Sequence, residues 1–341
     1  MPGNREEKQE QPHLAVRGAV VTGATGVVGS ALAAELVRRG IRVLALVRPD
    51  SPNRNHLPED PLLTTADCPL EALGSFVPPE EGGWDAFFHL GWAGTKGPSR
   101  EDPDIHTENI RYALDAVRLA RRLGCRVFVG AGSQAEYGRV SAPLEPDTPE
   151  RPESAYGIGK LAAGRMTRLL CRREGIRHVW TRILSVYGPG DGPRTLVTSL
   201  ITSLLEGEKP LTTAGGQIWD LLYSGDAARA LLAAAERGAD GRTYLIASGE
   251  ARTLRSQIET IRDAVSPGAA VGFGEIPYSP RQVMYLAADI RETERDLGWR
   301  PEVSLAEGAR RTAEQIRRQA EAKRMYVRYL TVTGFSREVR A

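Results

Sequence analysis

The sequence predicts an α/β fold built on a doubly wound parallel sheet, with a smaller C-terminal α/β lobe. Three observations support this prediction. Short apolar runs alternate with amphipathic segments between residues 18 and 184, as strands and helices do in parallel sheets. A glycine-rich turn joins the first apolar run directly to a helical segment. Beyond residue 184 the alternation becomes irregular, so we expect the second lobe to begin there.

The composition excludes several classes of protein. The 341 residues suffice for one large or two modest domains. Forty-five basic and 43 acidic residues leave a net charge of +2, so no global field attracts nucleic acid. No apolar run reaches the roughly 18 residues that a membrane span needs. We therefore expect neither a nucleic-acid partner nor a membrane anchor.

The two features that bear on location are the first segment and the cysteines. Residues 1–11 are polar and charged and contain no secretory signal, and we expect residues 1–17 to form a flexible leader. The three cysteines lie far apart and lack the spacing of metal ligands. We expect no metal site and a reducing, cytoplasmic compartment.

The first strand and helix form the best-defined candidate binding site. The apolar run 18–21 leads through three glycines, Gly23, Gly26 and Gly29, into a helix over 30–39. In a Rossmann-type dinucleotide site the first glycine allows the tight turn, the second admits the pyrophosphate, and the third permits close helix–strand packing. The helix N-terminus then stabilises the phosphates. The alternative is a plain strand–helix turn. The cofactor contacts expected from this turn are Gly23, Thr25, Gly26, Val27, Val28 and Gly29.

The second and third strands bear on the choice of cofactor. The strand over 42–47 is followed by Arg48, and no carboxylate comes until Asp50. An acid at this strand end usually binds the ribose of NAD, whereas an arginine can pair with the 2′-phosphate of NADP. We therefore favour NADP(H), with NAD(H) as the alternative if Arg48 is only a solvated loop residue. A third strand over 62–67 would place Asp67 near the adenine amino group.

Two further strands end where a cofactor and a substrate would meet. The strand over 84–90 enters a glycine loop, so the cofactor can pass close to the backbone at Leu90 and Gly91. The strand over 126–129 runs into Ser133. Ligands of open α/β sheets bind beyond the carboxyl ends of the strands, and the Ser133 hydroxyl is placed there. A serine in a turn is by itself only a turn former.

The central chemical feature is Tyr156, followed four residues later by Lys160. Pro152 and Ser154 predict a helix start, so both side chains would lie on one helix face. A cation beside a phenol favours the phenolate and lowers the tyrosine pKa. Such a group can exchange a proton with a sugar or carbonyl oxygen. The alternative is a chance pair on a solvated helix face, and the motifs upstream argue against it.

The rest of the chain alternates less regularly. We expect strands over 178–184 and 243–247 and near 221, and helices over 105–123, 196–205, 224–236, 253–265 and 305–319. The expected division is a dinucleotide-binding domain over 18–184 with 220–247, and a substrate-binding domain over 185–219 with 248–318. The tail, 319–341, is basic on balance, and an ordered arm, an oligomer contact and disorder all remain open.

Several motifs occur in a known order and spacing. They are the glycine turn, His89-Leu90-Gly91, Ser133, Tyr156-x-x-x-Lys160 and Tyr187-Gly188-Pro189-Gly190. Together they resemble the extended short-chain dehydrogenase/reductase family, in its nucleotide-sugar epimerase, dehydratase and reductase branch. The match spans roughly residues 18–318. The resemblance implies catalysis by Ser133, Tyr156 and Lys160, with Lys160 also holding the nicotinamide ribose.

Departures from that branch concern the substrate. Its dehydratases carry an acid pair directly after the serine position, where this chain has Gln134 and Ala135, so elimination of water is not expected. The branch usually has an asparagine at Ser185 and a diphosphate-binding arginine at Trp219. The substrate-binding residues that the resemblance implies are Trp92, Gln134, Ser185, Gln217, Trp219 and Arg281.

The segments 132–138 and 219–220 are most similar to reductases of CDP- or dTDP-linked 4-keto-6-deoxysugars. The resemblance therefore implies an NADPH-dependent reductase of a nucleotide-linked 4-keto sugar. One alternative is an NAD-dependent nucleotide-sugar 4-epimerase, which needs the same catalytic residues. Another is a cofactor-sensing regulatory protein on the same fold. The family also implies a homodimer that forms through the helices over 105–123 and 156–174.

Overall fold

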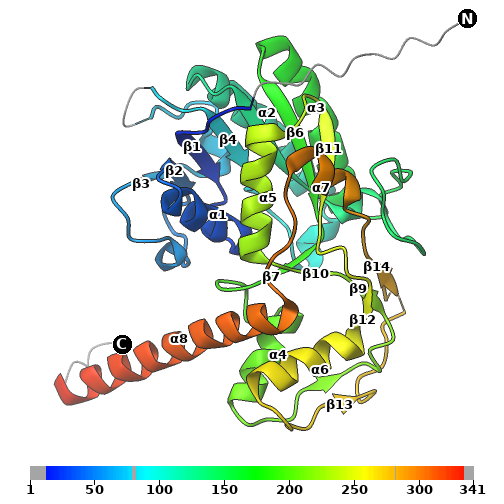
Figure 1. Cartoon of the computed structure of the whole chain (residues 1–341). Helices are drawn as coiled ribbons and strands as arrows, with labels where there is room; N and C mark the ends of the chain where they lie inside the picture. The colour runs from blue at the N-terminus through cyan, green and yellow to red at the C-terminus, as the bar shows by residue number, and fades with distance from the viewer. Residues whose placement is uncertain (1–12, 79–81, 281, 334–341) are drawn as a thin grey trace, which may run out of the picture.

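The computed structural model describes residues 13–78, 82–280 and 282–333. A seven-stranded sheet, in the order β11-β6-β5-β4-β1-β2-β3, forms the larger lobe (Figure 1). Every pair of neighbouring strands in it is parallel. The strands are β1 (Gly18–Thr22), β2 (Arg42–Val47), β3 (Leu63–Asp67), β4 (Ala86–His89), β5 (Val127–Ser133), β6 (Arg177–Ile183) and β11 (Arg242–Ile246). The predicted doubly wound α/β fold is confirmed.

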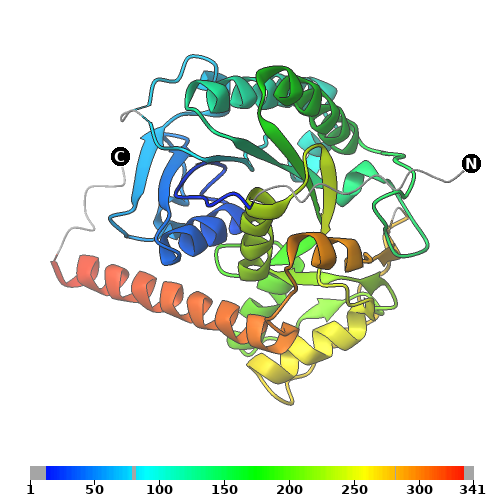
Figure 2. The same cartoon turned by 45° about the horizontal axis from the view of Figure 1, so that its top comes forward.

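Helices cover both faces of this sheet because its strands are apolar on both sides. On β1, Ala19 and Val21 join a core with Leu32 of α1 (Val27–Arg38). Val20 points the other way and packs in a second core with Val117 of α2 (Pro103–Arg122). α5 (Ser224–Arg237) and α7 (Arg291–Leu297) accompany α1, and α3 (Ala155–Glu174) accompanies α2. Figure 2 shows the two helical layers on either side of the sheet.

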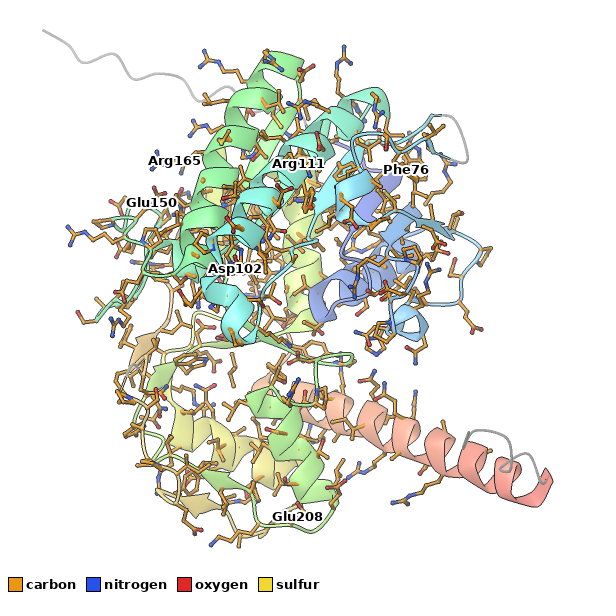
Figure 3. All side chains as sticks on the ribbon, turned by 180° about the vertical axis from the view of Figure 1, so that it is seen from behind. Phe76, Asp102, Arg111, Glu150, Arg165 and Glu208 are labelled. Atoms are coloured by element: carbon orange, nitrogen blue, oxygen red, sulfur yellow. The ribbon has the colours of Figure 1, made fainter. Side chains whose placement is uncertain are left out.

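A view from behind shows α2 and α3 side by side along the outer surface (Figure 3). The α2 helix starts after Asp102, whose carboxylate accepts hydrogen bonds from the backbone N–H groups of Asp104 and Ile105. The α3 helix starts after Ser154, whose hydroxyl accepts from the N–H of Gly157. The predicted helix start before Tyr156 is therefore present.

The smaller lobe has a core of its own, to which Leu200 and Ile258 contribute. Its helices are α4 (Leu196–Leu205), α6 (Leu254–Val265) and the first part of α8 (Leu305–Thr333). Its strands are β7 (Ser185–Tyr187), β8 (Leu211–Thr212), β9 (Ile218–Trp219), β10 (Leu221–Tyr223), β12 (Arg252–Thr253), β13 (Gly272–Phe273) and β14 (Tyr285–Leu286). The chain crosses between the lobes after β6 and returns through β10 and α5.

Two segments differ from the sequence-based expectation. Residues 13–17 are not a free leader, because Leu14 and Val16 are buried against the larger lobe and the Leu14 N–H donates to the Glu236 carbonyl. The last helix does not end at residue 319. It runs on to Thr333, and its second half projects away from the body (Figures 1 and 2). No helix in the described part of the chain combines the length and apolarity that a membrane crossing requires.

Candidate active site

The glycine turn lies at the carboxyl end of β1 and leads into the N-terminus of α1. Gly23 has a left-handed backbone (φ 68°), and a Cβ there would lie 2.6 Å from the Gly91 nitrogen. A Cβ on Gly29 would collide with the Gly23 carbonyl oxygen. Gly26 precedes α1, and no side chain caps the free N–H groups of its first turn. This cradle fits the pyrophosphate of a dinucleotide.

The end of β2 brings together residues that the sequence did not connect. Arg48 is exposed just beyond the strand, and its carbonyl oxygen accepts a hydrogen bond from Arg54. The Arg54 guanidinium also pairs with the Asp67 carboxylate. The Asp67 carboxylate thus carries an ion pair, and its contact with adenine stays a prediction. The Thr25 hydroxyl hydrogen-bonds to that of Ser51 at 3.1 Å. Arg54 was not predicted, because its partner Asp67 lies 13 positions further along the chain, at the end of β3.

Ser133 and Tyr156 meet at the carboxyl end of β5. The Ser133 hydroxyl donates to the Gln134 side-chain oxygen at 2.7 Å and accepts from the Ala135 N–H at 3.2 Å. Tyr156 is 9% exposed and hydrogen-bonds with Ser133. The predicted pair thus shares one site, although the two residues are 23 positions apart in the sequence.

The pKa of Tyr156 does not shift in the direction expected from Lys160. Burial raises the pKa of Tyr156, while the hydrogen bond with Ser133 and the charge of Arg100 act in the opposite direction. The Lys160 ammonium lies 5.9 Å from the centre of the Tyr156 ring and donates to the Ala131 carbonyl at 2.6 Å. Burial lowers the pKa of Lys160 to about 7. The expected lowering of the Tyr156 pKa by Lys160 is not seen, because burial sets the direction of the shift.

A buried ion pair holds the Ser133 turn in place. The Glu136 carboxylate accepts from the Ser133 N–H at 2.8 Å and from the Arg182 Nε at 2.6 Å. The indole N–H of Trp180 donates to the same carboxylate at 3.1 Å. Both charged residues are almost completely buried. Glu136 therefore fixes the position of the backbone that carries Ser133.

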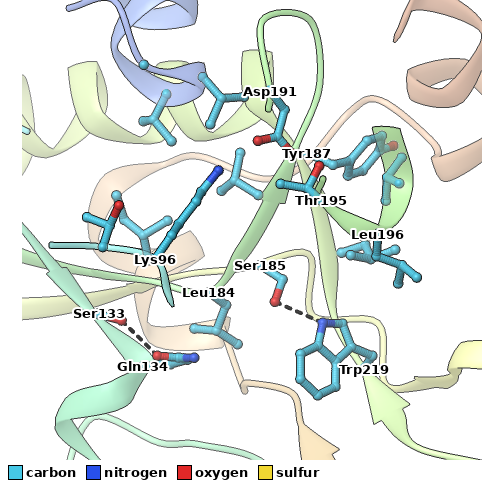
Figure 4. Close-up of a pocket in the computed structure, with 18 of the residues that line it drawn as sticks. Lys96, Ser133, Gln134, Leu184, Ser185, Tyr187, Asp191, Thr195, Leu196 and Trp219 are labelled. Atoms are coloured by element: carbon cyan, nitrogen blue, oxygen red, sulfur yellow. Dashed lines mark hydrogen bonds between the residues drawn. The ribbon is translucent and has the colours of Figure 1, made fainter. Parts of the chain in front are cut away.

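One cavity of about 810 Å³ connects these features (Figure 4). Its wall includes the α1 turn, Ser133, Tyr156 and Lys160 from the larger lobe, and Leu196 and Trp219 from the smaller lobe. The predicted substrate-binding residues on this wall are Trp92, Gln134, Ser185, Gln217 and Trp219. Arg281 lies outside the described residues. Of the predicted cofactor contacts, the wall includes Gly23, Gly26, Val27, Val28, Gly29, Leu90, Tyr156 and Lys160, and not Thr25, Arg48, Asp67 or Gly91.

The two departures from the family pattern touch each other. The Trp219 indole N–H donates to the Ser185 hydroxyl at 2.9 Å (Figure 4). Together they form one polar contact in a wall that also includes the apolar side chains of Leu221 and Ile258. Lys96 and Arg100 also line the cavity and were missed, because the short segment between β4 and α2 that carries them has no periodic apolar pattern. In the described part of the chain no three metal-ligating side chains cluster, so no metal centre is built there.

Comparison with known proteins agrees with this geometry. A family model described as the NAD dependent epimerase/dehydratase family matches residues 19–247. The chain is 25% identical over 317 residues to the dTDP-4-dehydro-6-deoxyglucose reductase of Escherichia coli, covering 88% of this chain and 98% of that protein. It is 27% identical over 304 residues to a UDP-glucose 4-epimerase of Corynebacterium glutamicum, covering 83% and 90%.

A solved structure of the Thermus thermophilus UDP-glucose 4-epimerase in complex with NAD superimposes with a TM-score of 0.75. It is 25% identical, and the alignment covers 88% of this chain and 99% of that one. The family match covers well over half of the chain, and the fold and the motif order agree with it. The chain therefore belongs to the NAD dependent epimerase/dehydratase family, the nucleotide-sugar branch of the extended short-chain dehydrogenases/reductases.

Proposed function

We propose that this protein is an NADPH-dependent reductase of a nucleotide-linked 4-keto sugar. The observation that carries the proposal is the single cavity that joins the α1 glycine turn to Ser133 and Tyr156. A dinucleotide laid along the turn would present its nicotinamide beside Tyr156. The remaining space reaches the smaller lobe, where a nucleotide sugar has room to bind.

The side chains divide the reaction between them. When bound, the cofactor supplies the hydride that reduces the carbonyl carbon. The Tyr156 hydroxyl donates its proton to the carbonyl oxygen, and Ser133 hydrogen-bonds to that oxygen. For this the Ser133 hydroxyl turns away from Gln134, which holds it in the structure. Lys160 would leave the Ala131 carbonyl and hold the ribose hydroxyls.

The residues after Ser133 argue against elimination of water. Gln134 is neutral and Ala135 has no titratable group. The one carboxylate in this turn, that of Glu136, pairs with Arg182 and accepts a hydrogen bond from the Ser133 N–H. It is therefore not available as an acid or base. This chain therefore lacks the acid and the base that elimination of water needs.

The end of β2 supports NADPH over NADH. Arg48 is exposed at the strand end, and Arg54 lies close by. Because Arg54 pairs with Asp67, the charges of these two residues offset each other, and Arg48 is the cation left at the strand end. A 2′-phosphate would be attracted to that charge, whereas a ribose hydroxyl needs an unpaired acid.

The alternative is a nucleotide-sugar 4-epimerase that retains NAD. The C. glutamicum relative and the T. thermophilus structure carry that activity in their names, and the latter contains NAD. An epimerase oxidises the sugar and returns the hydride to the opposite face, with the same proton donor. Nothing in the catalytic residues separates it from a reductase.

We also propose that the protein is a cytoplasmic homodimer. On the outer face of α3, Ile158, Met166 and Leu169 are 55%, 45% and 69% exposed. They follow helical spacing, so they form one apolar stripe that a second copy can cover. The three cysteines are free and buried, as in a reducing compartment. Analytical ultracentrifugation of Leu169→Glu against the unchanged protein tests the dimer.

The deciding experiment identifies the nucleotide that the purified protein carries. The protein is denatured, the supernatant is analysed by mass spectrometry, and binding of NADPH and NADH to the emptied protein is compared. An empty protein that binds NADPH more tightly, and that oxidises it with a 4-keto nucleotide sugar, supports the reductase. Stoichiometric NAD retained through purification would support the epimerase and reject the role of the β2 arginines.

A further inference from the structure

Arg100 lies directly against the Tyr156 ring. It belongs to the short helix η3 (Gly97–Glu101), between β4 and α2. Its guanidinium carbon is 4.0 Å from the centre of the Tyr156 ring, closer than the Lys160 ammonium at 5.9 Å. Arg100 lines the cavity, and one of its guanidinium N–H groups donates to the Thr95 carbonyl at 3.3 Å. No carboxylate pairs with it among the residues that the structure describes.

A buried network holds Arg100 in this place. The Trp92 indole N–H, which can only donate, lies 3.1 Å from Nδ1 of His106. The other ring nitrogen, Nε2, therefore carries the proton and donates to the Arg100 carbonyl at 3.1 Å. His106 and Asn109 of α2 are 2% and 1% exposed, and Asn109 bonds both backbone groups of Ala93. The loop that carries Arg100 is thus anchored to α2 on the protein side of the cavity.

Every element around Tyr156 contributes to its electrostatic environment. Arg100 supplies a positive charge from η3, Ser133 a hydrogen bond from β5, and Glu136 an opposing negative charge from the short helix η4 (Gln134–Glu136). Lys160 of α3 donates to the Ala131 carbonyl, and His106 of α2 faces the ring edge-on at 5.7 Å as a neutral imidazole. A guanidinium stays charged at every working pH, whereas a buried lysine can lose its proton.

We propose that Arg100 is a positioning residue that acts through Tyr156 and stabilises its phenolate by its charge. The inference rests on the proposed function. When the carbonyl is reduced, the Tyr156 O–H bond breaks, the proton passes to the carbonyl oxygen and the cofactor hydride to the carbon. The phenolate that remains lies beside the Arg100 charge. The same charge would favour the phenolate as base if the sugar is oxidised.

The test measures the ionisation of Tyr156 directly. Tyrosinate absorbance of the protein saturated with NADP⁺ is titrated between about pH 6 and about pH 12. The ionisation step that is present in the unchanged protein and absent from Tyr156→Phe belongs to Tyr156. We expect Arg100→Gln to move that step upward by about 1–3 pH units, because an opposite charge at this distance shifts a pKa by that amount. Arg100→Lys keeps the positive charge but loses the planar guanidinium group, so we expect a smaller shift than in Arg100→Gln.

Arg42→Gln is the matched control. Arg42 also stacks on an aromatic ring, with its guanidinium carbon 5.1 Å from the Trp84 ring centre, but it is the first residue of β2 and lies at the amino ends of the strands, whereas Tyr156 lies at the carboxyl ends. We expect it to leave the Tyr156 step in place. An unchanged step in Arg100→Gln, or a step missing from the unchanged protein, would overturn the role of Arg100. Hydride transfer that survives in Tyr156→Phe would instead overturn the proposed function, so the two failures are distinguishable.

Discussion

The buried ion pair under Ser133 offers the sharpest test of how the site is supported. Glu136 is fully buried and Arg182 is 3% exposed, so neither charge reaches water. Replacing Glu136 with Gln keeps the shape of the side chain and removes its charge. The new amide oxygen can still accept a hydrogen bond from either the Ser133 N–H or the Arg182 Nε–H. The amide NH₂ then faces the other of these two donors, and no hydrogen bond can form there. Arg182 keeps only Glu150, which is partly exposed.

The size of the effect follows from this arrangement. Removing one partner of a buried ion pair costs about 3–5 kcal/mol. Because Arg182 retains Glu150, we expect the lower end, about 3 kcal/mol. For a chain of this size, each kcal/mol of lost unfolding free energy lowers the thermal midpoint Tm by roughly 2 °C. The Tm should therefore fall by about 6 °C. The Ser133 N–H also loses a charged acceptor, so we expect the Ser133 turn to lose order and turnover to fall.

Thermal unfolding and urea unfolding of Glu136→Gln measure the loss of stability. Glu153→Gln is the control, because Glu153 pairs with Arg139 on the surface at 2.7 Å and both side chains are about half exposed. Surface pairs contribute little, so that variant should unfold like the unchanged protein. If Glu136→Gln were as stable as the control variant, the buried pair would not support the site as argued.

Three further predictions concern the catalytic residues and the turn. Tyr156→Phe should reduce turnover by about 10²–10⁴-fold while the dissociation constant for NADPH, measured by fluorescence, stays nearly unchanged; full activity would reject the proton donor. The pKa of Lys160 is about 7 in the folded protein against a usual 10.5, so the unfolded chain binds more protons between these values. Stability should therefore rise with pH from about 7 to about 10, by up to about 1.4 kcal/mol per unit, and urea unfolding of Lys160→Met should lose that rise. Gly29→Ala should lower Tm because its Cβ would collide with the Gly23 carbonyl, whereas Gly26→Ala, whose Cβ would lie at 3.5 Å, should keep its Tm and lose only cofactor affinity; equal effects on Tm would contradict the close approach.

The sequence by itself determined the features that depend on neighbouring residues. The alternation of apolar runs and amphipathic segments predicted the parallel sheet with helices on both faces, because strand and helix periodicity are local properties. The glycine turn was predictable for the same reason: Gly23 and Gly29 are placed by the few residues between β1 and α1. The spacing of Tyr156 and Lys160 on one helix is likewise local.

The tertiary structure decided how distant residues change each other's chemistry. Arg54, in the connection between β2 and β3, pairs with Asp67 at the end of β3, and Trp219 bonds Ser185 although 34 positions separate them. The Arg100 guanidinium reaches the Tyr156 ring only because α2 packs beside α3 and anchors the loop. Burial then raises the pKa of Tyr156, opposite to the direction expected from its lysine neighbour. Solvent exposure and contacts between remote segments follow from the packing of the whole chain, so no local pattern in the sequence contains them.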